Sequence, residues 1–358
     1  MTQTMDVRNV PAGLIEAAVA ATFAAAGCAD AEARTIANGL VEANLFGHDS
    51  HGVGLMPRYI ENLRQGLAKP GQTARITVDA GGIVGVDGGR GFGQVIGEQA
   101  MAIAIARAQA TGVCIVGVAN AHHLARIGRW AEQCAAADLA SVHFVNVLST
   151  PLVAPWGGTD ARLATNPFCV GVPHAPHPLV LDYATSMVAL GKVRVALDAG
   201  LPMGDGLLID AAGDATTDPA VMYTEPLGAL LPFGQHKGFA LAVMCELLGG
   251  ALSGGHVQHE SPDPNPMLNN MLSIVFAPDK LVGRDAFAEQ VRKLAAWVKG
   301  SPRQAGATGI WLPGEPERVT ARERARDGIP LPARTRDALA ACARAQGVAD
   351  FDEAFARE

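Results

Sequence analysis

The segment Lys69-Pro70-Gly71 divides the chain into two kinds of sequence. Before it, apolar residues recur at helical spacing, in Ala-rich runs over residues 14–26 and 31–46 and in a third run over 55–64. After it, short β-prone runs alternate with glycines. Proline followed by glycine ends a helix and begins a turn, so this segment predicts a boundary between a small helical unit and a sheet-containing unit.

The region after Gly71 alternates between predicted strands and predicted helices. Strands are predicted where β-branched and apolar residues cluster between glycines, and helices where apolar residues recur every three to four positions. Segment 256–270, with three prolines and two adjacent asparagines, predicts a loop long enough to be functional. We expect strands over 75–78, 82–86, 113–118, 140–145, 168–172, 179–181 and 273–276, and helices over 94–110, 128–137, 238–252, 287–298 and, after a break at 313–316, 333–345.

The composition, 358 residues with 49% hydrophobic and 18% charged, is that of a globular protein that can bury one large core or two moderate ones. Two domains are the expectation for this length. A net charge of -7 gives nucleic-acid phosphates little to bind, and the locally basic stretch 318–326 is best interpreted as a solvated helix face. The N-terminus lacks a signal-peptide pattern, and the most apolar segment, 238–252, is too short to span a bilayer. Six cysteines without a Cys-x-x-Cys pair favour a reducing compartment. We therefore expect a cytoplasmic protein without nucleic-acid or membrane partners.

Two histidine pairs are the strongest candidates for chemistry. Residues 47–52 read Gly-His-Asp-Ser-His-Gly, and His122 and His123 form the second pair. Histidine changes its protonation state near neutral pH, so these pairs predict general acid-base catalysis. His48, His51 and His123 could instead bind a divalent metal, although His48 is more simply a residue near the C-terminal dipole of a helix.

A glycine-rich run, Gly91-x-Gly93-x-x-x-Gly97, lies between a predicted strand and a predicted helix, as in dinucleotide-binding loops. The acidic residue that should end the next strand and bind ribose is missing, because residues 118–121 read Val-Ala-Asn-Ala. No Gly-Lys-Ser/Thr triplet follows a glycine-rich turn, which argues against a Walker loop. We interpret the run as a tight turn with a glycine-assisted helix start.

Polar residues also gather in turns beside apolar strands and helices. Each such turn has an ordinary interpretation as a capped turn, with Asp182 and Ser186 as N-cap candidates. Lys237 precedes an apolar helix and is either a solvated lysine or, at that helix start, a phosphate ligand. Ser50 lacks the strained Gly-x-Ser-x-Gly turn of a nucleophile, so we expect it to hydrogen-bond a substrate or a histidine. The turns are Thr165-Asn166-Pro167, Leu181-Asp182-Tyr183-Ala184-Thr185-Ser186, Gly234-Gln235-His236-Lys237-Gly238 and Pro313-Gly314-Glu315.

Together these segments resemble the malate/L-lactate dehydrogenase family that lacks a Rossmann fold. The resemblance implies an NAD(P)-dependent oxidoreductase that passes a hydride between the nicotinamide and C2 of a 2-hydroxy or 2-oxo acid. NAD is the expected cofactor and NADP the alternative. The resemblance covers nearly the whole chain, and its motifs at matching separations are residues 47–52, 153–157, 165–167, 181–186, 236–238 and 312–315.

The resemblance also implies roles by position. His123 would accept the proton in oxidation and donate it in reduction, with His51 beside it. Ser50, Leu55 and Tyr59 would face the substrate. No metal site is implied. The implied cofactor contacts are His51, Ala125, Arg126, Ile127, Leu181, Asp182, Tyr183, Ala184, Thr185, His236, Lys237, Asn269, Gly314, Glu315, Pro316 and Glu317.

Two departures from the family pattern bear on the site. The family commonly has Phe-Gly after the catalytic histidine, whereas this chain has Leu124-Ala125. Many members have an arginine four residues after the histidine of Ser-His-Gly, where this chain has Leu55. A leucine cannot pair with the second carboxylate of a diacid, so we expect a substrate with an apolar or aromatic side chain.

By the same resemblance the fold is of the α/β (α+β) class. A helical domain would be built from residues 1–72 and 300–358, and residues 73–299 would form a mainly antiparallel mixed-sheet domain that binds the cofactor without a Rossmann fold. The expected assembly is a homodimer. Two other hypotheses of function remain open. One is a metal-dependent lyase or hydrolase using His48, His51 and His123, and the other is a cofactor-binding scaffold without catalytic activity.

Overall fold

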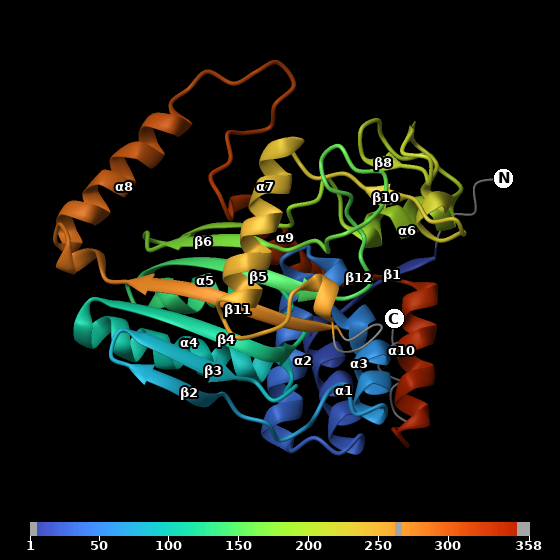
Figure 1. The fold of residues 1–358 in the computed structure, drawn as a ribbon, viewed down its shortest axis with the longest axis horizontal. Coiled ribbons are helices and arrows are strands. Elements are labelled where there is room, and N and C mark those ends of the chain that lie inside the picture. Colours follow the sequence, from blue (N-terminus) through green and yellow to red (C-terminus); the bar gives the residue numbers. More distant parts are fainter. Residues whose placement is uncertain (1–5, 262–266, 349–358) are drawn as a thin grey trace.

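A seven-stranded mixed sheet forms the centre of the protein (Figure 1). The computed structural model describes residues 6–261 and 267–348. Within these residues β3 and β4 are the only neighbouring strands of this sheet that run parallel, and the others pair antiparallel. The strand order is β2 (Arg75–Ala80), β3 (Ile83–Asp87), β4 (Val113–His122), β11 (Leu268–Phe276), β5 (Ala140–Leu148), β6 (Phe168–Val172) and β7 (Leu179–Tyr183).

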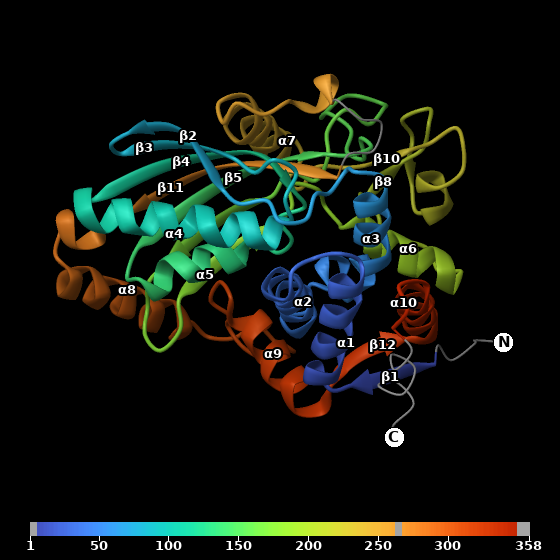
Figure 2. The same ribbon diagram turned by 90° about the horizontal axis from the view of Figure 1, so that it is seen from below.

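Helices cover both faces of this sheet (Figure 2). Helices α4 (Gly93–Thr111) and α5 (Gly128–Ala136) lie on one face, where Trp130 and Met101 are fully buried. Helix α7 (His236–Met244), which continues as the π-helix η4 (Cys245–Ala251), lies on the other. Burial on both faces explains why the central strands are predominantly apolar runs.

A second core joins the two ends of the chain. It is formed by α1 (Ala12–Ala25), α2 (Asp30–Leu45), α3 (Met56–Arg64) and α10 (Ala333–Ala345). Strand β1 (Val7–Val10) pairs antiparallel with β12 (Ile329–Pro332), which ties the N-terminal segment to the C-terminal one. The rings of Phe23, Tyr59 and Phe92 pack against one another in this core, so Phe92 connects it to the start of α4.

A third, smaller lobe is formed mainly by the chain between β7 and α7. Its core contains Val193 and Leu230, together with Val153 from the loop after β5, all fully buried. The sequence did not predict this lobe as a separate unit, because its strands are only two residues long. It consists of α6 (Leu190–Ala199), β8 (Leu208–Ile209), β9 (Ala215–Thr216) and β10 (Ala229–Leu230), with the short helix η3 (Pro219–Met222).

The remaining helices lie at the edges of the molecule. Helix α8 (Arg284–Lys299) forms an outer arm beyond the sheet (Figure 1), and α9 (Glu315–Asp327) lies beside α2. Short helices fill the connections: η1 (Asp49–His51), η2 (Val53–Leu55), η5 (Gln258–Glu260) and η6 (Pro278–Lys280). None of the helices in the described ranges is long and apolar enough to cross a membrane.

The predicted helices and strands are confirmed with shifts at their ends, and two local predictions are wrong. The predicted loop 256–270 ends too late, since Leu268 already begins β11 and Asn269 and Asn270 are strand residues; residues 262–266 of that loop lie outside the described ranges. The predicted break at 313–316 is also too long, because α9 starts at Glu315, with proline tolerated in its first turn.

Candidate functional site

A cavity of about 860 Å³ lies where the helical unit, the sheet and the third lobe meet. Its walls come from the segment after α2, from the loop after β4, from the end of β7 and from the starts of α6 and α9. Segments far apart in the sequence thus converge on one space. The predicted site residues that line it are Ser50, His51, Leu55, His123, Ala125, Arg126, Ile127, Asp182, Tyr183, Ala184, Pro316 and Glu317.

His123 lies directly after the last residue of β4 and faces this cavity. Its Nδ1 is 2.7 Å from the Tyr59 Oη, and its ring stacks on that of His51 with 5.3 Å between ring centroids. A Cβ atom added at Gly93 would lie 2.1 Å from the His123 carbonyl oxygen. The glycine-rich turn therefore lets the start of α4 approach the histidine backbone, which agrees with the structural interpretation of that run.

The surroundings of His123 favour a neutral imidazole. Burial lowers its pKa well below the ordinary value, and the nearby charges of His51, His122 and Arg58 lower it further. Burial also raises the pKa of Tyr59, so its phenol stays protonated, and Gln94 Nε2 donates to Tyr59 Oη at 3.3 Å. A neutral imidazole held by a neutral phenol can accept a proton near pH 7.

His51 lies in η1, beside the cavity, and its ring Nδ1 is 2.9 Å from Ser50 Oγ. This contact matches the predicted role of Ser50 as a hydrogen-bond partner of a histidine. Burial lowers the pKa of His51 to about 4, His48 lowers it as well, and the carboxylate of Asp182 opposes the shift. Burial raises the pKa of Asp182 in turn. The charges of His51 and Asp182 thus favour each other, whereas burial disfavours the charged form of each.

The predicted capping roles of Asp182 and Ser186 are wrong. Asp182 is a strand residue of β7, and its Oδ2 accepts a hydrogen bond from the Gly128 N–H at 2.7 Å, at the start of α5. It therefore caps a helix distant in the sequence rather than one that follows it. The Ser186 hydroxyl donates to the Val188 carbonyl oxygen at 2.9 Å and caps no helix.

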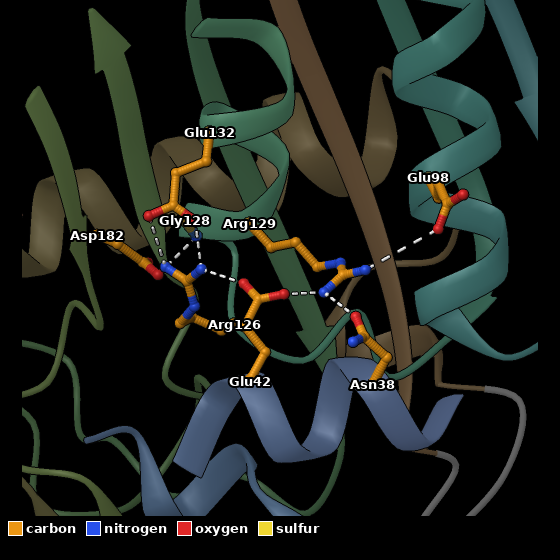
Figure 3. A network of polar contacts seen from close by, with 8 residues as sticks. All are labelled: Asn38, Glu42, Glu98, Arg126, Gly128, Arg129, Glu132 and Asp182. Atoms are coloured by element: carbon orange, nitrogen blue, oxygen red, sulfur yellow. Dashed lines mark hydrogen bonds and ion pairs between the residues drawn. The ribbon is translucent and has the colours of Figure 1, made fainter. Parts of the chain in front are cut away.

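Arg126 is held by carboxylates from two helices (Figure 3). Its Nη2 donates to Glu42 of α2 at 2.5 Å, and it also bonds Glu132 of α5. Arg129 reaches the other oxygen of Glu42, so the network joins α2 to α5. The Arg126 guanidinium also lies 4.2 Å from the centre of the Phe46 ring. This network fixes the loop after His123 against the helical unit.

The turn after His123 shows why the family favours glycine there. Ala125 has a φ of 58°, in the left-handed region, which disfavours a residue with a Cβ atom. The neighbouring Leu124 N–H donates to Asn269 Oδ1 at 2.7 Å, and Asn269 is buried. Asn269 therefore positions this turn from β11, although it does not line the cavity.

Other predicted cofactor residues also lie outside the cavity lining. Leu181 is partly exposed on β7, and Gly314 precedes α9 with a φ of 85°. The remaining ones have these partners: Thr185 Oγ1 donates to the Thr165 carbonyl at 2.9 Å, the His236 ring lies 5.5 Å from the Trp156 ring, Lys237 is exposed in the first turn of α7, and Glu315 pairs with Lys299 at 2.7 Å.

Sequence reasoning missed several residues that line the cavity. Arg58 could have been predicted from its spacing, since it follows Leu55 by three positions and residues so spaced share a helix face. Lys192 lies at the start of α6, a helix that the sequence analysis did not predict. The missed lining residues include Phe46, Arg58, Met187, Val188, Leu190, Lys192, Tyr223 and Met267.

The geometry gives no support to a metal site. No group of three or more His, Cys, Asp and Glu side chains within residues 6–261 and 267–348 is arranged to hold a metal ion. The ring centres of His48 and His51 are 6.5 Å apart. The His48 N–H donates to the Ala43 carbonyl of α2 at 2.8 Å, as expected for a residue just past a helix C-terminus. Burial lowers the pKa of its imidazole.

The fold and this histidine site have clear relatives. Residues 10–340 match the family model described as malate/L-lactate dehydrogenase. The chain is 47% identical to hydroxycarboxylate dehydrogenase B of Escherichia coli (strain K12) over 92% of each chain, and 40% identical to an L-lactate dehydrogenase of Cupriavidus necator over 79% of this chain and 82% of that one. It superposes on the sulfolactate dehydrogenase from Methanocaldococcus jannaschii with a TM-score of 0.87, at 29% identity, over 96% of this chain and 99% of that one.

The chain therefore belongs to the malate/L-lactate dehydrogenase family. Membership indicates a dehydrogenase that acts on hydroxycarboxylates. The resemblance seen in the sequence is confirmed, and the lyase alternative gains no support from the relatives or from the arrangement of the histidines.

Proposed function

We propose that the protein is an NAD(P)-dependent 2-hydroxycarboxylate dehydrogenase, or 2-oxo acid reductase, in which His123 is the general acid-base. The observation that carries this proposal is the position of His123: it faces the cavity, with Tyr59 at its Nδ1 and His51 stacked on its ring. One imidazole nitrogen is thereby held by a partner, and the other is available to a reacting hydroxyl.

The proton chemistry follows from these contacts. In oxidation the substrate hydroxyl gives its proton to Nε2 of neutral His123, in the tautomer whose Nδ1–H donates to Tyr59 Oη. In reduction the same Nε2 returns a proton to the oxygen on C2. His51 and Ser50 hydrogen-bond each other beside this position and would orient the substrate. The nicotinamide supplies or accepts the hydride when it is bound.

The cavity fits a nicotinamide cofactor together with a small acid. Its volume of about 860 Å³ is at the upper end for small-molecule sites and exceeds what a small oxo acid fills. Two of its lining residues, Arg126 and Glu317, each have a buried side-chain atom, Nε and Oε2 respectively, without a hydrogen-bond partner among the described residues. We infer that these residues bind polar groups of the cofactor. We infer NAD as the cofactor, with NADP as the alternative, bound without a Rossmann fold.

Within this proposal the cofactor contacts are those implied by the family. The residues that line the cavity, Ala125 to Ile127, Asp182 to Ala184, Pro316 and Glu317, would bind it directly. Leu181, Thr185, Asn269, Gly314 and Glu315 adjoin them in the chain or, like Asn269, hold the turn that carries them. His236 and Lys237, in the first turn of α7, would contact a part of the cofactor that extends beyond the cavity.

The substrate side chain is proposed to be apolar or aromatic. Leu55 lines the cavity where many relatives have an arginine, and Met187, Val188 and Leu190 add further apolar surface. A second carboxylate placed against these side chains would lose its hydration without gaining a partner. Phenylpyruvate and hydroxyphenylpyruvate therefore suit this wall better than oxaloacetate.

Parallel assays test the proposal. With NADH or NADPH, we expect kcat/KM for phenylpyruvate or hydroxyphenylpyruvate to exceed that for oxaloacetate by about 10-fold or more, and Leu55→Arg to narrow the gap. A preference of the unmodified protein for oxaloacetate would contradict the assignment of the apolar wall. Failure to bind either cofactor in a fluorescence titration would contradict the dehydrogenase itself, whereas binding without turnover of any oxo acid would favour the scaffold reading.

We also propose a homodimer in the cytoplasm. Helix α8 supports the dimer, because Leu294 and Trp297 are 59% and 78% exposed and a monomer would leave them in water. All six cysteines are free thiols, which suits a reducing compartment. Light scattering measures the assembly directly, and the mass of a single chain in solution would contradict the dimer.

A further inference from the structure

Among the described residues, three permanent cations line the cavity: Arg58, Arg126 and Lys192. The proposed substrate always carries a carboxylate bonded to its reacting carbon, and a carboxylate that leaves water needs a cation or hydrogen-bond donors. The question is which of the three cations binds this group. The answer deepens the proposed function and rests on it.

Arg126 is already committed to other carboxylates. Its side chain bonds Glu42 and Glu132, and it is 4% exposed. A substrate carboxylate placed against it would meet two negative charges as well as one positive charge. Arg126 is therefore a structural cation of the cavity wall, and its buried Nε has no hydrogen-bond partner among the described residues.

Arg58 and Lys192 lie on different walls of the cavity. Arg58 belongs to α3 and is next to Tyr59, whose hydroxyl is 2.7 Å from His123 Nδ1, whereas Lys192 belongs to α6, whose Gly191 lies against Ser50. The charge of Arg58 also lowers the pKa of His123. In a 2-oxo acid the carboxylate carbon is bonded directly to C2, whose oxygen must reach His123. The carboxylate-binding cation must therefore lie close to His123, a condition that favours Arg58 over Lys192.

We propose that Arg58 binds the C1 carboxylate of the 2-hydroxy or 2-oxo acid. Arg58 belongs to α3, the helix that also carries Tyr59, whose hydroxyl contacts His123. The residue that positions the general acid-base and the residue that binds the carboxylate are thus neighbours in the chain. Arg58 thereby orients C2 toward His123 and leaves Leu55 to face the substrate side chain.

The relation between Arg58 and Leu55 makes the assignment testable by exchange. Leu55 immediately precedes α3 and Arg58 lies three positions later, so both side chains point to the cavity side of the same helix. A cation moved from position 58 to position 55 remains on the same wall. The double variant Leu55→Arg/Arg58→Leu should therefore recover part of any function that Arg58→Leu loses.

The experiment compares phenylpyruvate with its uncharged methyl ester, using the full-length protein and NADH or NADPH. Arg58→Leu should raise KM for phenylpyruvate by about 10- to 100-fold, because a charge-assisted hydrogen bond is lost, and leave KM for the ester nearly unchanged. Cofactor affinity, measured by fluorescence, should stay as in the unmodified protein. The double variant should lower KM for the acid again.

A second readout separates binding from a general loss of structure. The pKa of His123 is lowered by burial, by His51 and His122, and by Arg58. Removing the Arg58 charge should therefore raise the pKa of His123, and the corresponding limb of the pH profile of kcat/KM for the ester should move to higher pH. A variant that merely unfolds would lose activity without this shift.

Two further variants complete the design. Arg64→Leu replaces an exposed arginine near the end of α3 and should leave both KM values unchanged. A KM for phenylpyruvate that stays within about twofold in Arg58→Leu, or a loss confined to Lys192→Met, would overturn the inference. An unmodified protein that reduces no 2-oxo acid would instead overturn the proposed function, so the two failures are distinguishable.

Discussion

His123 and His143 lie on either side of β11, and burial lowers the pKa of both. His143 is enclosed in the sheet: its Nδ1 is 2.7 Å from Ser273 Oγ and its Nε2 is 2.9 Å from Ser141 Oγ. Both of its ring nitrogens are thereby occupied. His123 has one nitrogen held by Tyr59 and faces a cavity. A lowered pKa marks burial in both regions, but only the histidine with access to a ligand is placed for chemistry.

The largest expected effect is the difference in turnover between variants of the two histidines. His123→Gln should lower kcat by about 100-fold or more, because the proton acceptor and donor is lost, while cofactor affinity stays nearly unchanged. His143→Gln should keep turnover close to that of the unmodified protein. Steady-state assays with phenylpyruvate measure both. Near-normal turnover of His123→Gln would move the role to His51 or elsewhere.

Removing a hydrogen-bond partner of each histidine should likewise lower kcat only on the His123 side, by a smaller factor. Tyr59→Phe removes the hydroxyl that contacts His123 and keeps the buried ring, so kcat should fall about 3- to 10-fold with little change in KM. Ser141→Ala removes one partner of His143 and should leave kcat unchanged. Equal losses in the two variants would mean that the Tyr59 contact acts through stability alone.

Much of the fold was predictable because its signals are local. Helix α10 and strand β6 have the predicted limits, 333–345 and 168–172, since periodicity and flanking proline or glycine specify them within a few residues. The pairing of β1 with β12 was not predictable, because it joins opposite ends of the chain. The two-residue strands of the third lobe carry too little pattern to be read.

In the candidate site, too, the sequence predicted residues but not their long-range contacts. The family resemblance pointed to His51, His123 and Asp182, which the structure brings to one cavity. Their partners depend on long-range packing: Asp182 binds the start of α5, 54 positions away in the chain. The role of Asn269 in holding the turn after His123 likewise requires β11 to lie beside β4. Spacing along the chain does not encode such contacts.

The smallest expected effect concerns stability at acidic pH. Burial lowers the pKa of His143 to about 3, against about 6.5 in an unfolded chain, so the unfolded state binds a proton first as the pH falls. The stability associated with neutral His143 is complete above pH 6.5 and is lost progressively between pH 6.5 and 3. Between pH 7 and pH 5 the unmodified protein should lose about 2 kcal/mol more unfolding free energy than His143→Gln.

Urea titrations at both pH values measure this difference, with His259→Gln as the control, because that imidazole is exposed to water in the folded as in the unfolded chain. Equal losses in the unmodified protein and in His143→Gln would show that His143 takes up a proton within the fold, and the contrast between the two histidines would then rest on the cavity alone.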